Sequence, residues 1–350
     1  MKNSAINKKV LLLSLSGLGN FLMQSPVFSI LKQTHPDWRL TVWVAPGRGT
    51  KSLADHNPNI DEVIEMPIKA SPWRHLKQIK YLRAKIFDLG LVLSPGQLIK
   101  SAAYLFLSGI PQRLGHAYPL GKNPASSFLL THTVPENSDL HDIEQNLSLL
   151  KALNITLPHH PAYQLTIPPI NQTQANHLWL SLNIPQTKTI ISFHPGSAPN
   201  FQWKRWPLEN FITAGQNLIK NHNAHILIFG GPAEASLKQK LGSALTGNSS
   251  VISSDLLTTT ALLRKCRLLL TNDSGLMHLA SASGVPVLAL FGPTNENQTG
   301  PRGQNAHVLR APGTLSLYHT EKNFNFTQSP HSTLKQLSPD LVIQTLAQLL

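Results

Sequence analysis

The residues with the clearest capacity for chemistry follow an apolar run that ends near Thr271. Asn272-Asp273-Ser274-Gly275 come next, and a helical pattern begins at Gly275. The first turn of a helix leaves backbone N–H groups unpaired, and its dipole favours an anion, so a diphosphate fits this place. We expect Asp273 to cap the helix and His278 to point toward the ligand one turn later. A plain helix cap followed by a buried histidine is the simpler alternative.

The following apolar run, 286–291, leads directly into Gly292-Pro293-Thr294. Neighbouring parallel strands present their carboxyl ends at the same edge of a sheet. We therefore expect this loop and the loop at Asp273 to converge at one sheet edge, where a ligand could contact both.

A second polar segment, His194-Pro195-Gly196-Ser197, also follows an apolar run, and Lys204-Arg205-Trp206-Pro207 lies a few residues further on. The Gly196-Ser197 turn can donate backbone and hydroxyl hydrogen bonds to phosphate oxygens. Lys204 or Arg205 can neutralise the charge that grows on a departing diphosphate. The alternative is a basic loop before a helix that has Pro207 at its first position.

A third segment, Phe229-Gly230-Gly231-Pro232-Ala233-Glu234, places two glycines at the end of another apolar run. Glycines permit a close approach of the backbone to a ligand, and Glu234 could bind ribose hydroxyls as acidic residues do in dinucleotide sites. A surface turn with a glutamate at a helix start explains the same residues.

The elements that must position these segments alternate between short apolar runs and helical patterns, which is typical of parallel α/β units. Prolines in 155–173 indicate a linker between two halves, and the chain after Pro312 is expected to be irregular until a final helix. The expected strands are 10–15, 40–44, 62–66, 89–93, 189–193, 225–229, 267–271 and 286–291. The expected helices are 21–32, 207–220, 258–265, 275–283 and 339–350.

The totals favour two domains and an anionic partner. The chain has 350 residues with 30 Lys and Arg against 17 Asp and Glu, a formal net charge of +13. Such an excess points to nucleic acid, an anionic membrane face or a phosphorylated glycolipid, although it also serves solubility alone. The single cysteine, Cys266, excludes an intramolecular disulfide. Glycines interrupt the apolar run after Lys8-Lys9, so we expect neither a signal peptide nor a membrane span, and a cytoplasmic protein that is at most peripheral to the inner membrane.

In this order, the quoted segments over 190–301 resemble glycosyltransferase family 9, which contains the ADP-heptose:lipopolysaccharide heptosyltransferases. Gly-Val-Pro at 284–286, Gly-Leu-Gly-Asn at 17–20 and the final helix match as well. The resemblance implies a GT-B fold, an α/β architecture of two Rossmann-like domains facing a central cleft. The implied boundaries are 1–168 for an acceptor-binding domain, 169–337 for a nucleotide-sugar-binding domain and 338–350 for a closing helix.

The resemblance also implies the chemistry: inverting transfer of heptose or a related sugar from a nucleotide diphosphate, ADP-linked, to a lipopolysaccharide core or similar glycan. It implies no divalent metal and no cofactor besides the nucleotide-sugar co-substrate, and the sequence has no Asp-x-Asp pair. Lys204 is the expected catalytic cation. The donor-binding residues that it implies are Gly196, Ser197, Lys204, Glu234, Asp273, Ser274, Gly275 and His278.

One departure affects the catalytic base. In the heptosyltransferases the loop after the first strand ends Gly-Asp, and the aspartate is the general base, whereas here Asn20 follows Gly19. An amide cannot take a proton at neutral pH, so a contribution of roughly 10²–10⁴-fold would be absent. His116 could act as the base, Asn20 could orient the acceptor hydroxyl, or the protein could be a weakly active or inactive nucleotide-sugar-binding homologue.

The acceptor side is predicted on a basic segment, 69–85, that includes Arg74, Lys77 and Lys80. Trp73, Leu76, Ile79 and Leu82 recur at every third position and predict an apolar stripe packed on the first sheet. The charges beside it suit an anionic membrane face or a phosphorylated lipid-sugar, together with Gly19 and His116. A nucleic-acid-binding protein is the competing class, but no nucleic-acid motif supports it and we expect no such partner.

Overall fold

The computed structural model describes residues 7–95, 98–118, 124–159, 161–313 and 333–350. Its contacts divide the chain into two compact units, Met1–Thr166 (unit 1) and Ile167–Leu350 (unit 2). The division lies two residues before the boundary expected from the sequence, and the terminal helix belongs to unit 2 rather than standing apart.

Unit 1 contains a six-stranded parallel sheet in the order β3-β2-β1-β4-β5-β6. Its strands are β1 (Lys9–Ser14), β2 (Arg39–Val44), β3 (Glu62–Glu65), β4 (Leu89–Val92), β5 (Gln112–Ala117) and β6 (His132–Pro135). Its helices are α1 (Leu18–Thr34), α2 (Thr50–Asp55), α3 (Pro72–Lys85), α4 (Leu98–Leu107), the 3-10 helix η1 (Pro124–Leu129) and α5 (Asp142–Lys151).

Unit 2 repeats the topology with the order β12-β11-β10-β7-β8-β9, again all parallel. Its strands are β7 (Thr189–His194), β8 (Ala224–Ile228), β9 (Ser249–Val251), β10 (Leu268–Asn272), β11 (Val287–Phe291) and β12 (Ala306–Arg310). Its helices are α6 (Pro169–Ser181), α7 (Leu208–His222), α8 (Ala235–Ala244), α9 (Leu256–Leu263), α10 (Gly275–Ala282), α11 (Glu296–Thr299) and α12 (Pro339–Leu349), with the 3-10 helices η2 (Pro199–Lys204), η3 (Pro232–Glu234) and η4 (Thr333–Gln336). Each unit is a doubly wound, Rossmann-like sheet, as expected.

The central strands were predictable because both faces of a parallel sheet are covered by helices, so these strands read as continuous apolar runs. All eight expected strands form, each within one residue of its expected ends. The strands that the sequence did not indicate are β5, β6, β9 and β12. Three of these are partly exposed edge or near-edge strands with polar residues, and β5 carries Gln112, Arg113 and His116, so no apolar run marks them.

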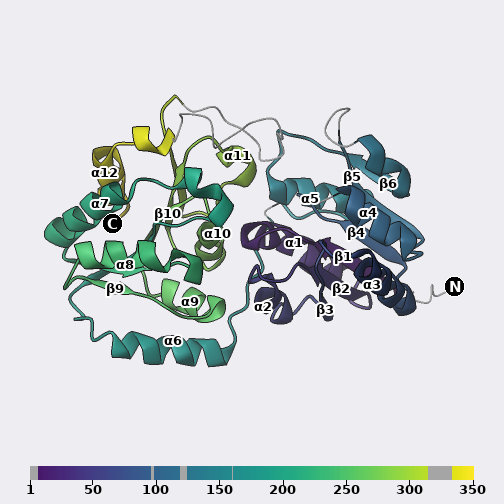
Figure 1. Ribbon diagram of the computed structural model, residues 1–350, viewed down its shortest axis with the longest axis horizontal. Helices are drawn as coiled ribbons and strands as arrows, with labels where there is room; N and C mark the ends of the chain where they lie inside the picture. The colour runs from purple at the N-terminus through teal and green to yellow at the C-terminus, as the bar shows by residue number, and fades with distance from the viewer. Residues whose placement is uncertain (1–6, 96–97, 119–123, 160, 314–332) are drawn as a thin grey trace. The chain divides into compact units, whose positions relative to one another are not determined.

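Helices cover both faces of each sheet (Figure 1). In unit 1, one face packs Leu11, Leu13 and Trp43 against side chains of α3 and α4, including Leu82 and Leu105. In unit 2, alternate residues of β7, β8, β10 and β11 pack against α7, α8 and α12. Close packing in these cores fixes the positions of the strand ends, and the loops that follow the strands start from these fixed positions.

Two expected boundaries were wrong because they ignored the first turns of helices. The segment 155–173 was expected to be a linker throughout, but α6 begins at Pro169, since a proline at the first helical position loses no hydrogen bond. Residues Gly17–Asn20 were expected to be a loop, yet α1 begins at Leu18 with Gly17 as its extended N-cap residue. Asn20 therefore lies on a helix.

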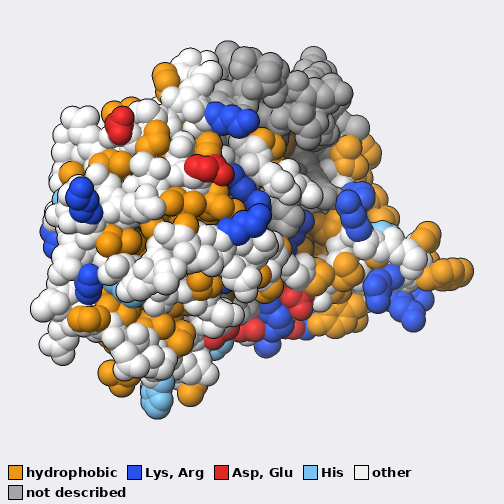
Figure 2. Space-filling view, turned by 60° about the vertical axis from the view of Figure 1, so that its left-hand side comes forward, with side chains coloured by type: hydrophobic (Ala, Val, Ile, Leu, Met, Phe, Trp, Pro, Cys, Tyr) orange, Lys and Arg blue, Asp and Glu red, His pale blue; other side chains and the backbone are white. Residues whose placement is uncertain are grey.

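The surface reflects the basic composition. On the face shown in Figure 2, Lys and Arg side chains are more widespread than Asp and Glu side chains. Within the described ranges, no helix combines the length and the hydropathy that crossing a membrane requires. The irregular segment expected after Pro312 falls largely at 314–332, outside the described residues.

Candidate functional site

The segments that the sequence predicted to bind the donor converge at the carboxyl edge of the sheet of unit 2. In this strand order the chain reverses direction between β7 and β10, which pair in parallel, and ligands of doubly wound sheets bind at that switch point. His194 ends β7 and Asn272 ends β10. The predicted convergence of loops is therefore correct, and it includes the loop after β7 as well as those after β10 and β11.

Asn272 connects these loops, a role that the sequence did not reveal. Its Nδ2 donates to the backbone oxygens of Pro195 (2.9 Å) and Gly196 (3.1 Å), and its Oδ1 accepts from Trp206 N (2.9 Å). The side chain is fully buried. One amide thus fixes the turn at Gly196 and the segment after Lys204 against the end of β10. Asn272 precedes the predicted Asp273, and only its burial and bond geometry distinguish it as a positioning residue.

Lys204 and Asp273 form a buried ion pair at this edge. Lys204 Nζ lies 2.5 Å from Asp273 Oδ2, and Thr294 Oγ1 donates to the same oxygen at 2.7 Å. Burial alone would raise the pKa of Asp273. The Lys204 ammonium and the two hydrogen bonds outweigh it and hold the pKa of this carboxyl below its usual value. Asp273 is therefore ionised at neutral pH, and Lys204 is held in one place by it.

Asp273 does not cap α10, which corrects the expectation from the sequence. The N-cap residue is Ser274, in an extended conformation, and its side chain makes no capping hydrogen bond to the helix. The Asp273 carboxylate is instead used by Lys204 and Thr294. Ser274 and Gly275 are half-buried, so the start of α10 is not sealed by packing. The first-turn N–H groups remain suited to an anion from outside the chain.

The Glu234 carboxylate lies next to His194 and close to two glycines, Gly196 after β7 and Gly230 after β8. The Nε2 of His194 lies 3.3 Å from Glu234 Oε2, and Gly231 N donates to the same oxygen at 2.7 Å. A Cβ at Gly196 would overlap the Glu234 carboxylate, and Gly230 adopts a φ of +152° that favours glycine. Burial raises the pKa of Glu234, but the contacts with His194 and Gly231 lower it below the usual value overall.

The Glu234 carboxylate is therefore ionised at neutral pH, next to the carboxyl edge of the sheet of unit 2. It sits in a capping position of η3 as the simpler alternative proposed, and it also faces His194.

Ser197 is oriented differently from the expectation. Its Oγ donates to Phe201 O at 2.8 Å and accepts from Arg205 Nε at 3.0 Å, while Arg205 Nη2 donates to Ser197 O. The hydroxyl is thus occupied by its own loop. Arg205 stabilises this turn, which leaves Lys204 as the cation held at Asp273.

His278 is 4% exposed on the first turn of α10. Burial lowers its pKa to about 4, with the Asp273 charge opposing and the Lys204 charge adding to that shift. The imidazole is neutral at physiological pH and supplies no positive charge to a diphosphate. Its place beside the site is as expected, but its buried state matches the simpler alternative.

In unit 1, Gly19 and Asn20 lie in the first turn of α1, directly after β1, and both are half-buried. Within the described ranges the Asn20 amide has no hydrogen-bond partner. The end of β1 is the corresponding switch point of the first sheet, next to β4. Asn20 is therefore placed where a ligand of unit 1 is expected to bind.

His116 does not suit the role of a general base. It is 1% exposed, and its Nε2 lies 2.9 Å from Gln145 O and 3.3 Å from Ser148 Oγ, so it joins β5 to α5. Burial lowers its pKa to about 4 despite the hydrogen bond to Gln145. This burial and this contact argue for a structural role rather than contact with an acceptor.

The stripe predicted on α3 is only half buried. Leu82 is fully buried and Ile79 partly so, but Leu76 is 50% and Trp73 77% exposed. Each step of three residues turns about 60° short of a full helical revolution, so the three steps from Trp73 to Leu82 place these two residues on opposite sides of the helix. Arg74, Lys77 and Lys80 are exposed as predicted.

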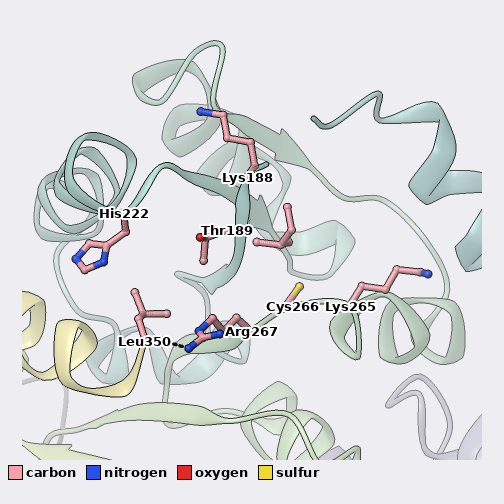
Figure 3. Close-up of a pocket in the computed structure, with 8 residues that line it drawn as sticks. Lys188, Thr189, His222, Lys265, Cys266, Arg267 and Leu350 are labelled. Carbon is pink, nitrogen blue, oxygen red and sulfur yellow. Dashed lines mark hydrogen bonds between the residues drawn. The ribbon is translucent and has the colours of Figure 1, made fainter. Parts of the chain in front are cut away.

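A pocket of about 720 Å³ lies at the opposite, amino-terminal edge of the second sheet (Figure 3). Lys188, His222, Lys265 and Arg267 line it, and Arg267 contacts the backbone oxygen of Leu350. None of the residues predicted to bind the donor lines it. In the described part of the chain, no group of three or more His, Cys, Asp or Glu side chains is arranged to hold a metal ion.

Comparison with known proteins agrees with this geometry. Residues 75–325 match the family described as glycosyltransferase family 9 (heptosyltransferase). Lipooligosaccharide heptosyltransferase 2 of Haemophilus ducreyi is 27% identical over 362 residues, covering 98% of this chain and 99% of that protein.

Two solved structures are similar over nearly their full length. The glycosyl transferase family 9 protein of Veillonella parvula has a TM-score of 0.82 at 24% identity and covers 98% of this chain and 97% of its own. E. coli ADP-heptose lps heptosyltransferase II has a TM-score of 0.76 at 24% identity, covering 97% and 98%. The fold is GT-B, with two Rossmann-like domains, as the sequence predicted.

The connecting role of Asn272 predicts a strong effect of a nearly isosteric change. Asn272→Asp removes the Nδ2 donor and sets a carboxylate against the Pro195 and Gly196 oxygens. We expect a loss of about 3 kcal/mol or more in the free energy of unfolding, measured with urea at neutral pH. Asn305→Asp, at an exposed position, is the matched control and should change it by less than about 0.5 kcal/mol. Equal effects of the two substitutions would refute the role of Asn272.

The buried His116 predicts a loss of stability in acid. Its pKa is about 4 when folded and 6.5 in the unfolded reference, so the unfolded chain binds more protons between these values. The contribution is complete above pH 6.5 and is lost as the pH falls toward 4, by about 2 kcal/mol between roughly pH 7.5 and pH 5. His116→Gln has no proton to gain and should lose less stability in urea titrations at these two pH values. An identical loss in parent and variant would contradict this.

Proposed function

The chain belongs to glycosyltransferase family 9, the heptosyltransferases, and from that premise we propose that it transfers heptose or a related sugar from an ADP-linked donor to a lipopolysaccharide core or similar bacterial glycan. The relatives carry these substrates in their names, and the match extends over nearly the whole of each chain. The observation that carries the proposal is the Lys204–Asp273 pair beside the open first turn of α10.

Unit 2 is proposed to hold the donor. The diphosphate accepts hydrogen bonds from first-turn N–H groups of α10 and from the Ser274 hydroxyl, while Lys204 faces its charge. Gly196 and Gly275 allow the backbone to approach, and Glu234 is available to ribose hydroxyls. Because Asn272 fixes the loops, the hydrogen-bonding groups of the site are oriented before the nucleotide sugar binds. Little reorganisation of the protein is then needed during the reaction.

The proposed reaction is an inverting displacement. An acceptor hydroxyl oxygen forms a bond to the anomeric carbon while the bond from that carbon to the diphosphate oxygen breaks on the opposite face. Negative charge grows on the leaving diphosphate, and Lys204 stabilises it more strongly in the transition state than in the ground state. We propose that this cation, not a divalent metal, supplies the stabilisation, with no cofactor beyond the co-substrate.

Unit 1 is proposed to present the acceptor through the first turn of α1 and the exposed cations Arg74, Lys77 and Lys80. These ammonium and guanidinium groups suit phosphates or carboxylates on the acceptor. The proposed location is the cytoplasm, with peripheral contact to the inner membrane. We propose no nucleic-acid partner.

A second candidate function rests on Asn20. Because its amide cannot take the proton of the acceptor hydroxyl and His116 is buried, a nucleotide-sugar-binding homologue with little or no transferase activity is the alternative. In the active form, Asn20 orients the hydroxyl and the proton passes to solvent.

Donor binding tests the site in unit 2. ADP should raise the melting temperature of the parent by mass action, in buffer containing EDTA. Lys204→Met removes the cation that faces the diphosphate, and Asp273→Ala releases the lysine from its position, so each should lose most of the shift. Lys188→Met, in the pocket at the opposite edge, is the charge-matched control and should keep it. A full shift in both site variants, or one that disappears with EDTA, would contradict the proposal.

The proton acceptor is tested by Asn20→Asp. A carboxylate at this position of α1 can accept the proton, so we expect the turnover number to rise by about 10²-fold or more, with little change in ADP binding. The measurement is transfer from ADP-heptose to a lipopolysaccharide core lacking heptose. A rate that does not rise, with the ADP-induced shift intact, would show that position 20 does not limit proton removal.

A further inference from the structure

Helix α4 is apolar on both of its sides. Its inner residues Ala102 and Leu105 belong to the core of unit 1. On the outer side, Ile99, Phe106 and Leu107 recur at helical spacing and are 44%, 49% and 51% exposed. Apart from Lys100, the described side chains on this outer side are apolar, and an exposed apolar helix face is typical of a contact with a partner or a lipid surface. The outer face of α4 therefore calls for an apolar partner outside unit 1.

Helix α3 lies beside α4 and adds aromatic and basic side chains. Tyr104 OH of α4 donates to Gln78 Oε1 of α3 at 2.5 Å, which joins the two helices on one face of the first sheet. The outer side of α3 exposes Trp73 and Leu76. On the same helix four cations are exposed: Arg74, Lys77, Lys80 and Arg83.

The 3-10 helix η1 extends this face. It contacts α4, and its Phe128 is 77% exposed. We call a set of exposed apolar and cationic side chains on α3, α4 and η1 the α3–α4 surface. It consists of Trp73, Arg74, Leu76, Lys77, Lys80, Arg83, Ile99, Lys100, Phe106, Leu107 and Phe128. Neither Asp nor Glu occurs in any of these three helices.

The residue types on this surface indicate which kind of partner it binds. Tryptophan and phenylalanine prefer the boundary between headgroups and acyl chains, and long cationic side chains reach from there to anionic headgroups. Each Lys or Arg near such a membrane adds attraction that weakens with salt. A nucleic acid would use the cations but leave the aliphatic side chains of α4 exposed to water.

We propose that the α3–α4 surface docks unit 1 onto an anionic phospholipid bilayer, with Trp73, Phe106, Leu107 and Phe128 entering the interface and the lysines and arginines facing the headgroups. The idea deepens the proposed function, because it gives an enzyme with a lipid-linked acceptor a way to remain at the surface where that acceptor lies. The proposed property is affinity for lipid, which requires neither the sugar donor nor the acceptor.

The test is flotation of the protein with vesicles in the absence of substrates. The full chain should float with vesicles of phosphatidylethanolamine and phosphatidylglycerol, less so at high salt, and hardly at all with phosphatidylcholine alone. The triple substitution Phe106→Ser, Leu107→Ser and Phe128→Ser should lower the partition coefficient about tenfold or more, because it removes apolar area from the interface. Leu180→Ser, at a 73% exposed position of α6 in unit 2, is the matched control and should float like the parent.

A second variant guards against misfolding of the first. Trp73→Ser alone should reduce flotation as well, with the melting temperature of each variant measured beside that of the parent. Absence of parental binding to the anionic vesicles, or equal binding by the parent and both variants, would overturn the proposal. A parental dimer that the triple substitution dissociates, without vesicle binding, would assign the surface to a second copy of the chain instead.

The same variants separate this proposal from the proposed function. With an acceptor whose acyl chains have been removed, the triple variant should transfer sugar at the parental rate, while transfer to acceptor embedded in anionic vesicles should fall. Normal flotation without any transfer would leave the docking intact and count against the proposed function alone.

Discussion

The candidate site of unit 2 depends on a negative charge that is buried with its counter-ion. Asp273 is almost fully buried, and a carboxylate there is tolerated only because Lys204 and Thr294 contact it. Removing one partner of such a pair costs about 3–5 kcal/mol. The pair joins the segments that contain Lys204 and Asp273, and the hydrogen bond from Thr294 adds a third segment of unit 2. The same constraint fixes the Lys204 ammonium at the sheet edge. The same ion pair thus stabilises the fold and positions the charge. Asn272 adds the hydrogen bonds to backbone oxygens that hold the turn at Gly196 in place.

Much of this architecture was predictable from the sequence, for a physical reason. Strands covered on both faces must be apolar throughout, so β1, β7, β10 and β11 stood out as runs, and the polar residues after them marked the sheet edge. Periodicity could not find β5 or β12, whose side chains are partly polar and exposed. It also misjudged α3, where spacing of three residues resembled a stripe but turned Trp73 away from the core.

The site itself was predictable by residue type more than by role. Asp273 and Lys204 lie at the predicted sheet edge. The Asp273 carboxylate could either cap the helix or form an ion pair, and only the three-dimensional structure shows that it forms the ion pair. The bonds of the Ser197 hydroxyl, the burial of His116 and the contacts of Asn272 depend on residues far away in the chain. No local pattern encodes them. The sequence has an amide, Asn20, where the resemblance implied an aspartate base. The structure places this residue half-buried in the first turn of α1, and the effect of the amide on proton transfer stays a prediction.

The central claim is that a diphosphate binds at the start of α10, and a crystal structure of the protein with ADP tests it most directly. We expect phosphate oxygens within hydrogen-bond distance of Lys204 Nζ and of the first-turn N–H groups that follow Ser274. ADP phosphates bound instead among Lys188, Lys265 and Arg267, at the amino-terminal edge of the same sheet, would contradict it.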